Sequence, residues 1–275
     1  MMKTMLLLAL AGQDDLVAGE ARKLCGGMGW TEGPNVDRSG HVYFAGDGKI
    51  MKWDGKILTR VFHEYSNIGA IRFDKDGNFV FTGGKGVTRI SPDGKRVETL
   101  AETYGGKPFN QPNDLCITAK GGIYFTDPNY GAPERQDKHA VYFIPPKGGT
   151  VVRVADDMVQ PNGIECSRER LYVADPQGGK VFVYGMNDDG TLRDKRLFAE
   201  GLRCDGLKLD EKGNVYTTTD PGIEIFSPEG KLLGCIKVPE RPSNLCFGGK
   251  TLYVTATTSL YAVPMKVGGR VMDGK

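Results

Sequence analysis

The feature that most constrains the fold of this chain is a short apolar segment that recurs six times. Each copy is a β-branched or aromatic run, such as Ile-Tyr-Phe at residues 123–125. The copies are centred on Tyr43, Val80, Tyr124, Tyr172, Tyr216 and Tyr253. Neighbouring centres lie 37 to 48 residues apart. Repetition at this interval is typical of the blades of a β-propeller.

Each copy also predicts more than one strand. In the third copy, residues 115–117 and 123–126 flank a Lys-Gly-Gly turn and predict a hairpin. A further strand is expected at 141–144 and a shorter one at 151–154. Four of the six hairpin turns end in glycine, which adopts the positive φ that tight turns need. We therefore predict an all-β fold, a six-bladed β-propeller with four-stranded blades.

The two ends of the repeat array predict how the ring closes. The sixth copy has three strands and is followed only by residues 267–275, whereas residues 21–25 resemble a fourth strand with no blade of its own. An N-terminal strand that completes the last blade would remove its exposed edge. Two packed β-sandwich domains are the alternative, but they do not explain this leftover strand. We predict a single propeller domain at 20–275, preceded by a tail or short signal segment at 1–19.

Composition excludes several classes of partner. The 275 residues include 39 glycines and 15 prolines, which fits a chain with many turns. The formal net charge is +2 with both signs interspersed, so no basic stripe predicts nucleic-acid binding. No apolar run approaches the roughly 20 residues of a membrane span. We expect a small-molecule substrate, no nucleic acid, no membrane and a monomer or dimer.

The location of the protein has two interpretations. Lys3, an apolar run at 5–11 and acidic residues at 14–15 resemble a short secretory signal, which favours a periplasmic or secreted protein. The cysteines favour a cytoplasmic one, because most lie inside apolar strand runs and look like small buried apolar residues. These cysteines are Cys116, Cys166, Cys235 and Cys246.

Residues at one equivalent position of each repeat are expected to converge. The position lies five residues before the end of the first strand, and the first strands of a propeller line its central channel. It is occupied by Glu32, Gly69, Asn113, Asn162, Asp205 and Asn244. The sequence therefore predicts a ring of two carboxylates, three amides and a glycine at one end of the channel.

This ring has the chemistry of a metal site. Glu32 and Asp205 would balance the charge of a divalent cation, and Asn113 and Asn162 would add neutral oxygens. We expect one divalent ion, Ca²⁺ foremost, with Mg²⁺, Mn²⁺ and Zn²⁺ as alternatives. The competing interpretation is that these residues only shape turns and cap loops. Four oxygen-bearing side chains at one repeat-equivalent position favour the metal.

Several short motifs carry a family resemblance. They are Trp-Thr-Glu-Gly-Pro at 30–34, Gln-Pro-Asn-Asp-Leu at 111–115, Phe-Thr-Asp-Pro at 125–128, Gln-Pro-Asn-Gly at 160–163 and Cys-Asp-Gly-Leu at 204–207. In these the chain resembles the gluconolactonase/regucalcin (senescence marker protein) family, in its bacterial gluconolactonase-like branch, from about residue 20 to 265. The resemblance implies a six-bladed propeller whose catalytic divalent ion is held by Glu32, Asn113, Asn162 and Asp205.

The chain departs from the family pattern at two positions. The second-blade residue, often Asn in the family, is Gly69, and Gln111 stands where sugar-lactone members carry Arg. Both changes leave the expected metal ligands in place, but the identity of the substrate is not determined by the resemblance.

Other polar residues are expected near the same end. Asp47, Asp127, Asp175 and Asp220 follow the second strands of their blades. They could bind substrate hydroxyls or a second cation, or they could cap loops before proline. We include Asp127 with Asn113, Gln111 and Tyr130 as expected substrate-binding residues.

These observations predict a metal-dependent hydrolase, foremost a lactonase that opens a sugar-type lactone. The ion would polarise the ester carbonyl, and Asp205 would take the proton from the attacking water. Two alternatives stay open. One is a phosphotriesterase-like hydrolase on the same site, and the other is a non-catalytic propeller that binds Ca²⁺ or a partner protein.

Overall fold

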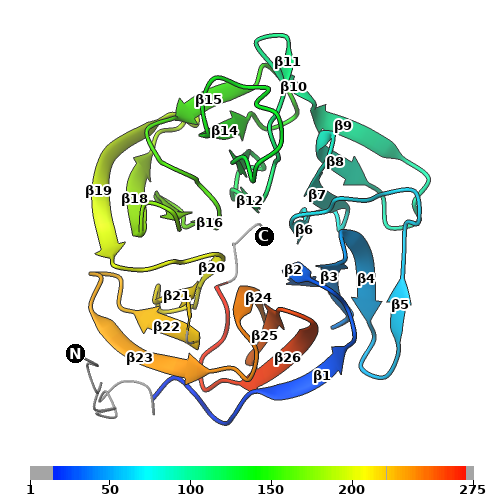
Figure 1. Ribbon diagram of the computed structural model, residues 1–275, viewed down its shortest axis with the longest axis vertical. Helices are drawn as coiled ribbons and strands as arrows, with labels where there is room; N and C mark the ends of the chain where they lie inside the picture. The colour runs from blue at the N-terminus through cyan, green and yellow to red at the C-terminus, as the bar shows by residue number, and fades with distance from the viewer. Residues whose placement is uncertain (1–14, 221, 271–275) are drawn as a thin grey trace.

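The computed structural model describes residues 15–220 and 222–270. Within them the chain forms six four-stranded antiparallel sheets arranged as blades around a central axis (Figure 1). The predicted six-bladed propeller is therefore confirmed.

The first three blades follow the chain in order. The first contains β2 (Thr31–Val36), β3 (Val42–Gly46), β4 (Lys49–Trp53) and β5 (Leu58–Arg60). The second contains β6 (Ile71–Phe73), β7 (Phe79–Gly83), β8 (Gly86–Ile90) and β9 (Val97–Ala101). The third contains β12 (Leu115–Ile117), β13 (Ile123–Asp127), β14 (Ala140–Ile144) and β15 (Val152–Ala155).

The other three blades complete the ring. The fourth contains β16 (Ile164–Cys166), β17 (Arg170–Asp175), β18 (Lys180–Met186) and β19 (Leu192–Glu200). The fifth contains β20 (Leu207–Leu209), β21 (Val215–Thr218), β22 (Gly222–Phe226) and β23 (Leu232–Lys237). The sixth contains β24 (Pro242–Gly248), β25 (Thr251–Ala256), β26 (Ser259–Pro264) and β1 (Arg22–Gly26).

One short hairpin lies outside the repeat and was not predicted. It joins the second and third blades and consists of β10 (Thr103–Tyr104) and β11 (Lys107–Pro108).

The hairpin turns show why this sequence forms strands of this length. Asp37 Oδ1 accepts hydrogen bonds from the backbone N–H groups of Ser39 and His41, each at 2.9 Å. The turns beginning at Asp74 and Asp210 repeat this arrangement. Each of these turns contains a glycine at positive φ, for example Gly40 at 84°. The aspartate caps the turn and the glycine allows the chain to reverse.

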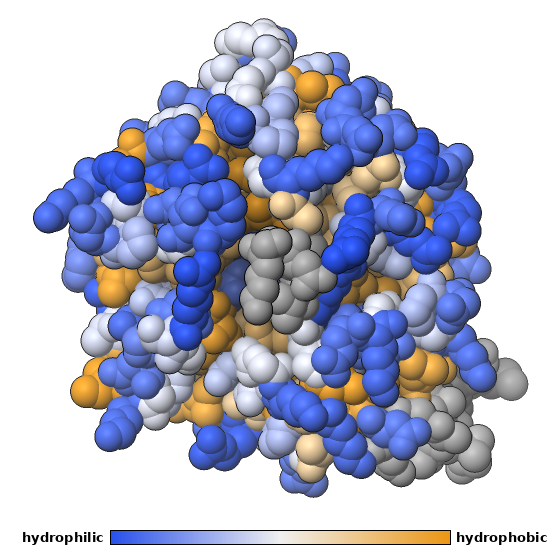
Figure 2. Space-filling view, turned by 180° about the vertical axis from the view of Figure 1, so that it is seen from behind, coloured by the Kyte–Doolittle hydropathy of each residue, from blue (hydrophilic) through white to orange (hydrophobic). Residues whose placement is uncertain are grey.

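The apolar core lies between blades. Buried side chains of neighbouring sheets pack together, as where Val80 and Val87 of the second blade share one cluster with Phe125 and Tyr142 of the third. The described part of the chain has no helix long and apolar enough to cross a membrane. On the face shown in Figure 2, hydrophilic residues predominate and apolar ones are scattered among them.

The N-terminal strand closes the ring as predicted. β1 pairs antiparallel with β26, and Lys23 forms a 3.1 Å ion pair with Glu240. Upstream of β1, Leu16 is buried against the apolar side chains of the fifth and sixth blades. The boundary predicted at residues 19 and 20 stays a prediction, and the signal-like segment lies almost wholly outside the described residues.

Removing β1 is expected to destabilise the propeller because it leaves β26 as an unpaired edge. Each lost hydrogen bond costs about 0.5–1.5 kcal/mol. Each kcal/mol lowers Tm by about 2–4 °C in a chain of this size. A truncation lacking residues 1–26 should therefore melt more than about 5 °C below one lacking residues 1–14, measured by thermal denaturation. Equal melting temperatures for the two truncations would contradict the assigned role of β1.

Candidate metal and substrate site

A cavity of about 410 Å³ opens at one end of the central channel. It is lined by Trp30, Glu32, Gly48, Asn67, Ile68, Gly69, Gln111, Pro112, Asn113, Tyr130, Asn162 and Asp205. The structure thus brings together the four side chains expected to hold a metal ion, and with them Gln111 and Tyr130. The four expected ligands lie at or just before the innermost strands of four blades, namely β2, β12, β16 and β20 (Figure 1).

Hydrogen bonds between blades position the backbone of the site residues. The Thr82 hydroxyl of the second blade donates to the Asn113 carbonyl of the third. The Thr126 hydroxyl donates to the Asn162 carbonyl at 2.7 Å. The Gly163 amide donates to the Asp205 carbonyl at 2.8 Å. Each of these site residues is therefore fixed by the blade that precedes it.

The same close approach accounts for Gly69. A Cβ atom at this position would lie 2.3 Å from the Asn113 carbonyl oxygen. That distance is far below van der Waals contact, so no side chain fits on this backbone. At the second blade the cavity is lined by Asn67, Ile68 and Gly69.

The amide oxygens of Asn113 and Asn162 are the most informative atoms of the site. Both Oδ1 atoms are buried and have no hydrogen-bond partner among the described residues. Asn162 Nδ2 donates to the Tyr130 hydroxyl at 2.7 Å, which fixes the orientation of this amide. A buried acceptor without a donor costs about 1–3 kcal/mol. Such atoms usually have a functional explanation or bind an ion or water.

The carboxylates of the site lie in an unfavourable environment for negative charge. Burial and the nearby Asp205 and Asp114 carboxylates raise the pKa of Glu32 well above its ordinary value, although a hydrogen bond from Asn244 opposes this. Burial raises the pKa of Asp205 to about 7, against the opposing charge of Arg241. A cation between Glu32 and Asp205 would offset both burial and mutual repulsion.

A second layer of polar residues supports Glu32. Asn244 Nδ2 donates to Glu32 Oε1 at 2.7 Å and to Asp114 Oδ2 at 3.1 Å. The other oxygen of Asp114 pairs with Arg72 at 2.8 Å, and both partners are buried. Asn244 belonged to the predicted ring, but here its amide positions Glu32 and it does not line the cavity. The sequence signal for Asp114 is its place directly after Asn113 in the third-blade motif.

Asp127 occupies a different place from the one expected of a substrate-binding residue. It is fully buried and does not line the cavity. Its two oxygens accept hydrogen bonds from the backbone N–H groups of Asn110 and Gln111 at 2.9 and 2.8 Å. Asp127 is therefore not positioned to contact a substrate in this cavity. Its carboxylate holds the loop that carries Gln111, which corresponds to the loop-capping alternative.

Two of the other candidate aspartates have the same arrangement. Asp175 accepts from the N–H groups of Val159 and Gln160, each at 2.9 Å. Asp47 accepts from those of Gly29 and Trp30. These carboxylates hold the loops that enter the first strands.

Gln111 and Tyr130 are linked across the rim of the cavity. Gln111 Oε1 accepts a 2.6 Å hydrogen bond from the Tyr130 backbone N–H. Tyr130 is 47% exposed, and its hydroxyl accepts a hydrogen bond from Asn162. His139, whose imidazole could act as a base, lies outside the cavity, and its Nδ1 is 2.7 Å from the Val159 carbonyl oxygen.

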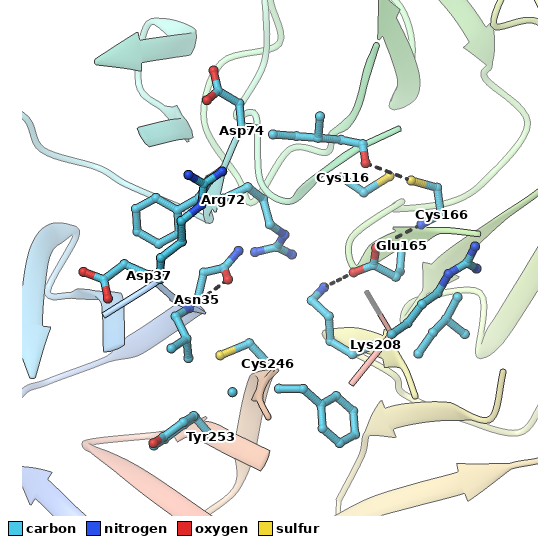
Figure 3. Close-up of a pocket in the computed structure, with 18 of the residues that line it drawn as sticks. Asn35, Asp37, Arg72, Asp74, Cys116, Glu165, Cys166, Lys208, Cys246 and Tyr253 are labelled. Atoms are coloured by element: carbon cyan, nitrogen blue, oxygen red, sulfur yellow. Dashed lines mark hydrogen bonds and ion pairs between the residues drawn. The ribbon is translucent and has the colours of Figure 1, made fainter. Parts of the chain in front are cut away.

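A larger cavity, of about 750 Å³, lies at the other end of the first strands (Figure 3). Its buried charges are already paired. Arg72 is bound to Asp114, and Lys208 Nζ is 2.9 Å from Glu165 Oε2. Of the thiols shown there, burial raises the pKa of Cys246 to about 12. Among the described residues that line this cavity, no buried side-chain oxygen is without a hydrogen-bond partner, in contrast to the first cavity.

The six cysteines are free, and Cys116, Cys166 and Cys246 are buried, as expected for small apolar residues. Cys204 is also buried, whereas Cys25 and Cys235 are half-buried.

The candidate site depends on its amides to form a complete set of metal ligands. Among residues 15–220 and 222–270, no group of three or more His, Cys, Asp or Glu side chains could hold a metal ion. Glu32 and Asp205 provide two carboxylates, and Asn113 and Asn162 provide the two unpartnered oxygens. An all-oxygen set of this kind fits a hard divalent cation.

Fold and site together define a six-bladed propeller with an oxygen-lined polar centre at one end of its channel. The chain belongs to the SMP-30/gluconolactonase/LRE-like family, whose model matches residues 30–258. It is 29% identical to a gluconolactonase of Zymomonas mobilis over 87% of this chain and 80% of that protein.

Two solved structures are also similar. One protein, provisionally called a gluconolactonase, has a TM-score of 0.88 and 28% identity, covering 96% of this chain and 99% of its own. A gluconolactonase from Xanthomonas campestris has a TM-score of 0.83 and 27% identity, covering 89% of each chain. The predicted family resemblance is confirmed.

Proposed function

We propose that this protein is a metal-dependent lactone hydrolase. The observation that carries the proposal is the pair of buried, unpartnered amide oxygens of Asn113 and Asn162 beside the carboxylates of Glu32 and Asp205. Membership of the SMP-30/gluconolactonase family and the similarity to gluconolactonases support a lactone as the substrate class.

Glu32, Asn113, Asn162 and Asp205 would hold the ion. Two carboxylates balance a 2+ charge, and amide oxygens complete the set without adding charge. Carboxylate and amide oxygens are typical ligands of Ca²⁺, which we propose as the ion. Mg²⁺ and Mn²⁺ also bind oxygen ligands, whereas the absence of His and Cys from this set makes Zn²⁺ a poorer match.

When bound, the ion would polarise the lactone carbonyl as a Lewis acid. Asp205 would act as the general base. Burial raises the pKa of Asp205 to about 7 before an ion is bound, and a bound cation would lower it again. Asp205 would take a proton from water as the water oxygen bonds to the carbonyl carbon. The ring C–O bond then breaks, and Asp205 returns the proton to the ring oxygen.

The remaining polar residues orient the reacting groups. The Tyr130 hydroxyl accepts from Asn162 Nδ2 and so turns the Asn162 oxygen away from itself. Asn244 holds one oxygen of Glu32. Gln111, held by Asp127, and Tyr130 form the rim that a substrate would pass. Trp30, which is 41% exposed, adds an apolar side chain to the lining of the cavity.

A panel of lactones tests the function. Metal-free protein, prepared with EDTA, should lack hydrolysis that Ca²⁺ or another divalent ion restores, as followed by proton release at constant pH. Phosphotriesters belong in the same panel, because the site chemistry would also suit them. Hydrolysis that persists without a divalent ion would contradict metal dependence. A protein that binds Ca²⁺ but hydrolyses neither class would favour a binding role.

The substitution Asp205→Asn separates ion binding from proton transfer. Asparagine keeps an oxygen ligand of similar shape but removes the charge and the proton acceptor. We expect kcat at saturating metal to fall about 10²–10⁴-fold, the usual contribution of a general base. Calorimetric titration of the ion ensures that saturation is reached.

Asn162→Asp is the matched control for that variant. It adds charge beside the ion and leaves Asp205 in place, so its effect should follow ion affinity. Full activity of metal-saturated Asp205→Asn would remove Asp205 from the proton-transfer role and leave ion binding as its function.

A further inference from the structure

A second cavity, of about 320 Å³, adjoins the candidate site. It is lined by Tyr130, Gln160, Asn162, Pro176, Gln177, Arg203, Asp205 and Arg241. Tyr130, Asn162 and Asp205 line both cavities, so the two spaces meet at the polar centre. We call the space lined by Arg203 and Arg241 the arginine lobe. A molecule with its ester at the centre could extend into this lobe.

The two guanidinium groups of the arginine lobe are available for a ligand. Neither Arg203 nor Arg241 forms an ion pair or a side-chain hydrogen bond with a described residue, and both are exposed. Arg72 and Arg153, by contrast, pair with carboxylates at 2.8 and 2.6 Å. Arg241 lies beside the centre, because it lines this cavity together with Asp205.

The backbone that carries both arginines is held in place. Arg241 precedes β24, and its carbonyl accepts hydrogen bonds from the Thr257 N–H at 3.0 Å and the Thr257 hydroxyl at 3.2 Å. Arg203 lies between β19 and β20, two residues before Asp205, whose own backbone is bonded to the fourth and fifth blades. The position of the arginine lobe relative to the centre is therefore set by the propeller.

The carboxylates of the polar centre do not neutralise the positive charges of Arg203 and Arg241. Asp205 is the one acidic residue among those that line the arginine lobe. With a divalent cation bound, Glu32 and Asp205 would be balanced by that ion, and Asp114 is paired with Arg72. Two positive charges then remain in a space that adjoins the site of reaction. Guanidinium groups bind carboxylates and phosphates through paired, charge-assisted hydrogen bonds.

We propose that the arginine lobe binds an anionic substituent, a carboxylate or a phosphate, of the lactone substrate. This inference rests on the proposed function and narrows its substrate class to lactones with an acidic group outside the ring ester. Gln111 in the first cavity contributes no positive charge, and its side-chain oxygen already accepts a hydrogen bond from the Tyr130 N–H. The arginines of the lobe are therefore the cationic groups that we assign to an anionic substituent.

Three lactones of one ring type test the proposal: glucono-1,5-lactone, 6-phosphoglucono-1,5-lactone and glucaro-1,5-lactone. The measured quantity is the ratio of kcat/KM for each anionic lactone to that for the neutral one, at saturating Ca²⁺. We expect at least one ratio to be about 10 or more, the scale of a partly exposed charge-assisted contact. Which ratio is high distinguishes a phosphate from a carboxylate as the substituent.

Arg203→Gln combined with Arg241→Gln should bring the high ratio close to one. Arg38→Gln, in the cavity at the other end of the channel, should keep the wild-type ratio. The double variant should not bind Ca²⁺ more weakly, because it removes positive charge near the ion. Calorimetric titration with Ca²⁺ measures this affinity. Unchanged affinity shows that the double variant has lost the contact with the anionic substituent and that its metal site is intact.

The proposal is overturned if wild-type ratios are near one, or if the double variant keeps a high ratio. Failure of the proposed function is a different result, namely that none of the three lactones is hydrolysed. In that case calorimetry with glucose 6-phosphate and glucuronate, each compared with neutral glucose, still tests the arginine lobe. Tighter binding of either anion that disappears in the double variant would support an anion site, and equal binding of all three compounds would overturn it.

Discussion

The structure of the site depends on hydrogen bonds between the innermost strands of neighbouring blades. A hydroxyl or amide of one blade donates to the backbone carbonyl of the next at Asn113, Asn162 and Asp205. The Ser243 hydroxyl likewise donates to the Thr31 carbonyl at 2.7 Å, which joins the last blade to the first. Closure of the ring by β1 therefore also bears on the geometry of the centre, because the sixth blade supports the strand that carries Glu32.

This backbone arrangement concentrates oxygen atoms without supplying donors to all of them. Two carboxylates with raised pKa values and two unpartnered amide oxygens make the centre unfavourable as it stands. The ion pair of Arg72 and Asp114 shows that this propeller can match a buried charge with a partner. At the centre no such partner is present among the described residues, and the divalent cation that we propose would satisfy all four groups.

Much of the architecture could be predicted because the repeat is visible in the sequence. The recurring run around Tyr43, Tyr124 and their equivalents predicts the six blades, and the leftover strand at 21–25 predicts the closure. Repeat equivalence also predicts that residues as distant as Glu32 and Asp205 meet, since blades are related by rotation about one axis.

Other features depend on side-chain orientation, which a repeat does not determine. Asp127 is adjacent to the site in sequence, yet its carboxylate turns to the backbone of Asn110 and Gln111. Asn244 occupies a ring position, yet it binds Glu32 rather than lining the cavity. Arg203 and Arg241 lie in segments between blades, and only the folded chain shows that both border the space beside Asp205.

The main proposal is that one divalent ion binds between Glu32, Asn113, Asn162 and Asp205. A crystal structure of the protein grown with Ca²⁺, with the ion located by anomalous scattering, is the most direct measurement. We predict one strong site with oxygens of Glu32, Asn113, Asn162 and Asp205 at about 2.3–2.6 Å. An ion bound elsewhere while these four side chains stay more than about 8 Å apart would contradict it, because no cation reaches ligands at that separation.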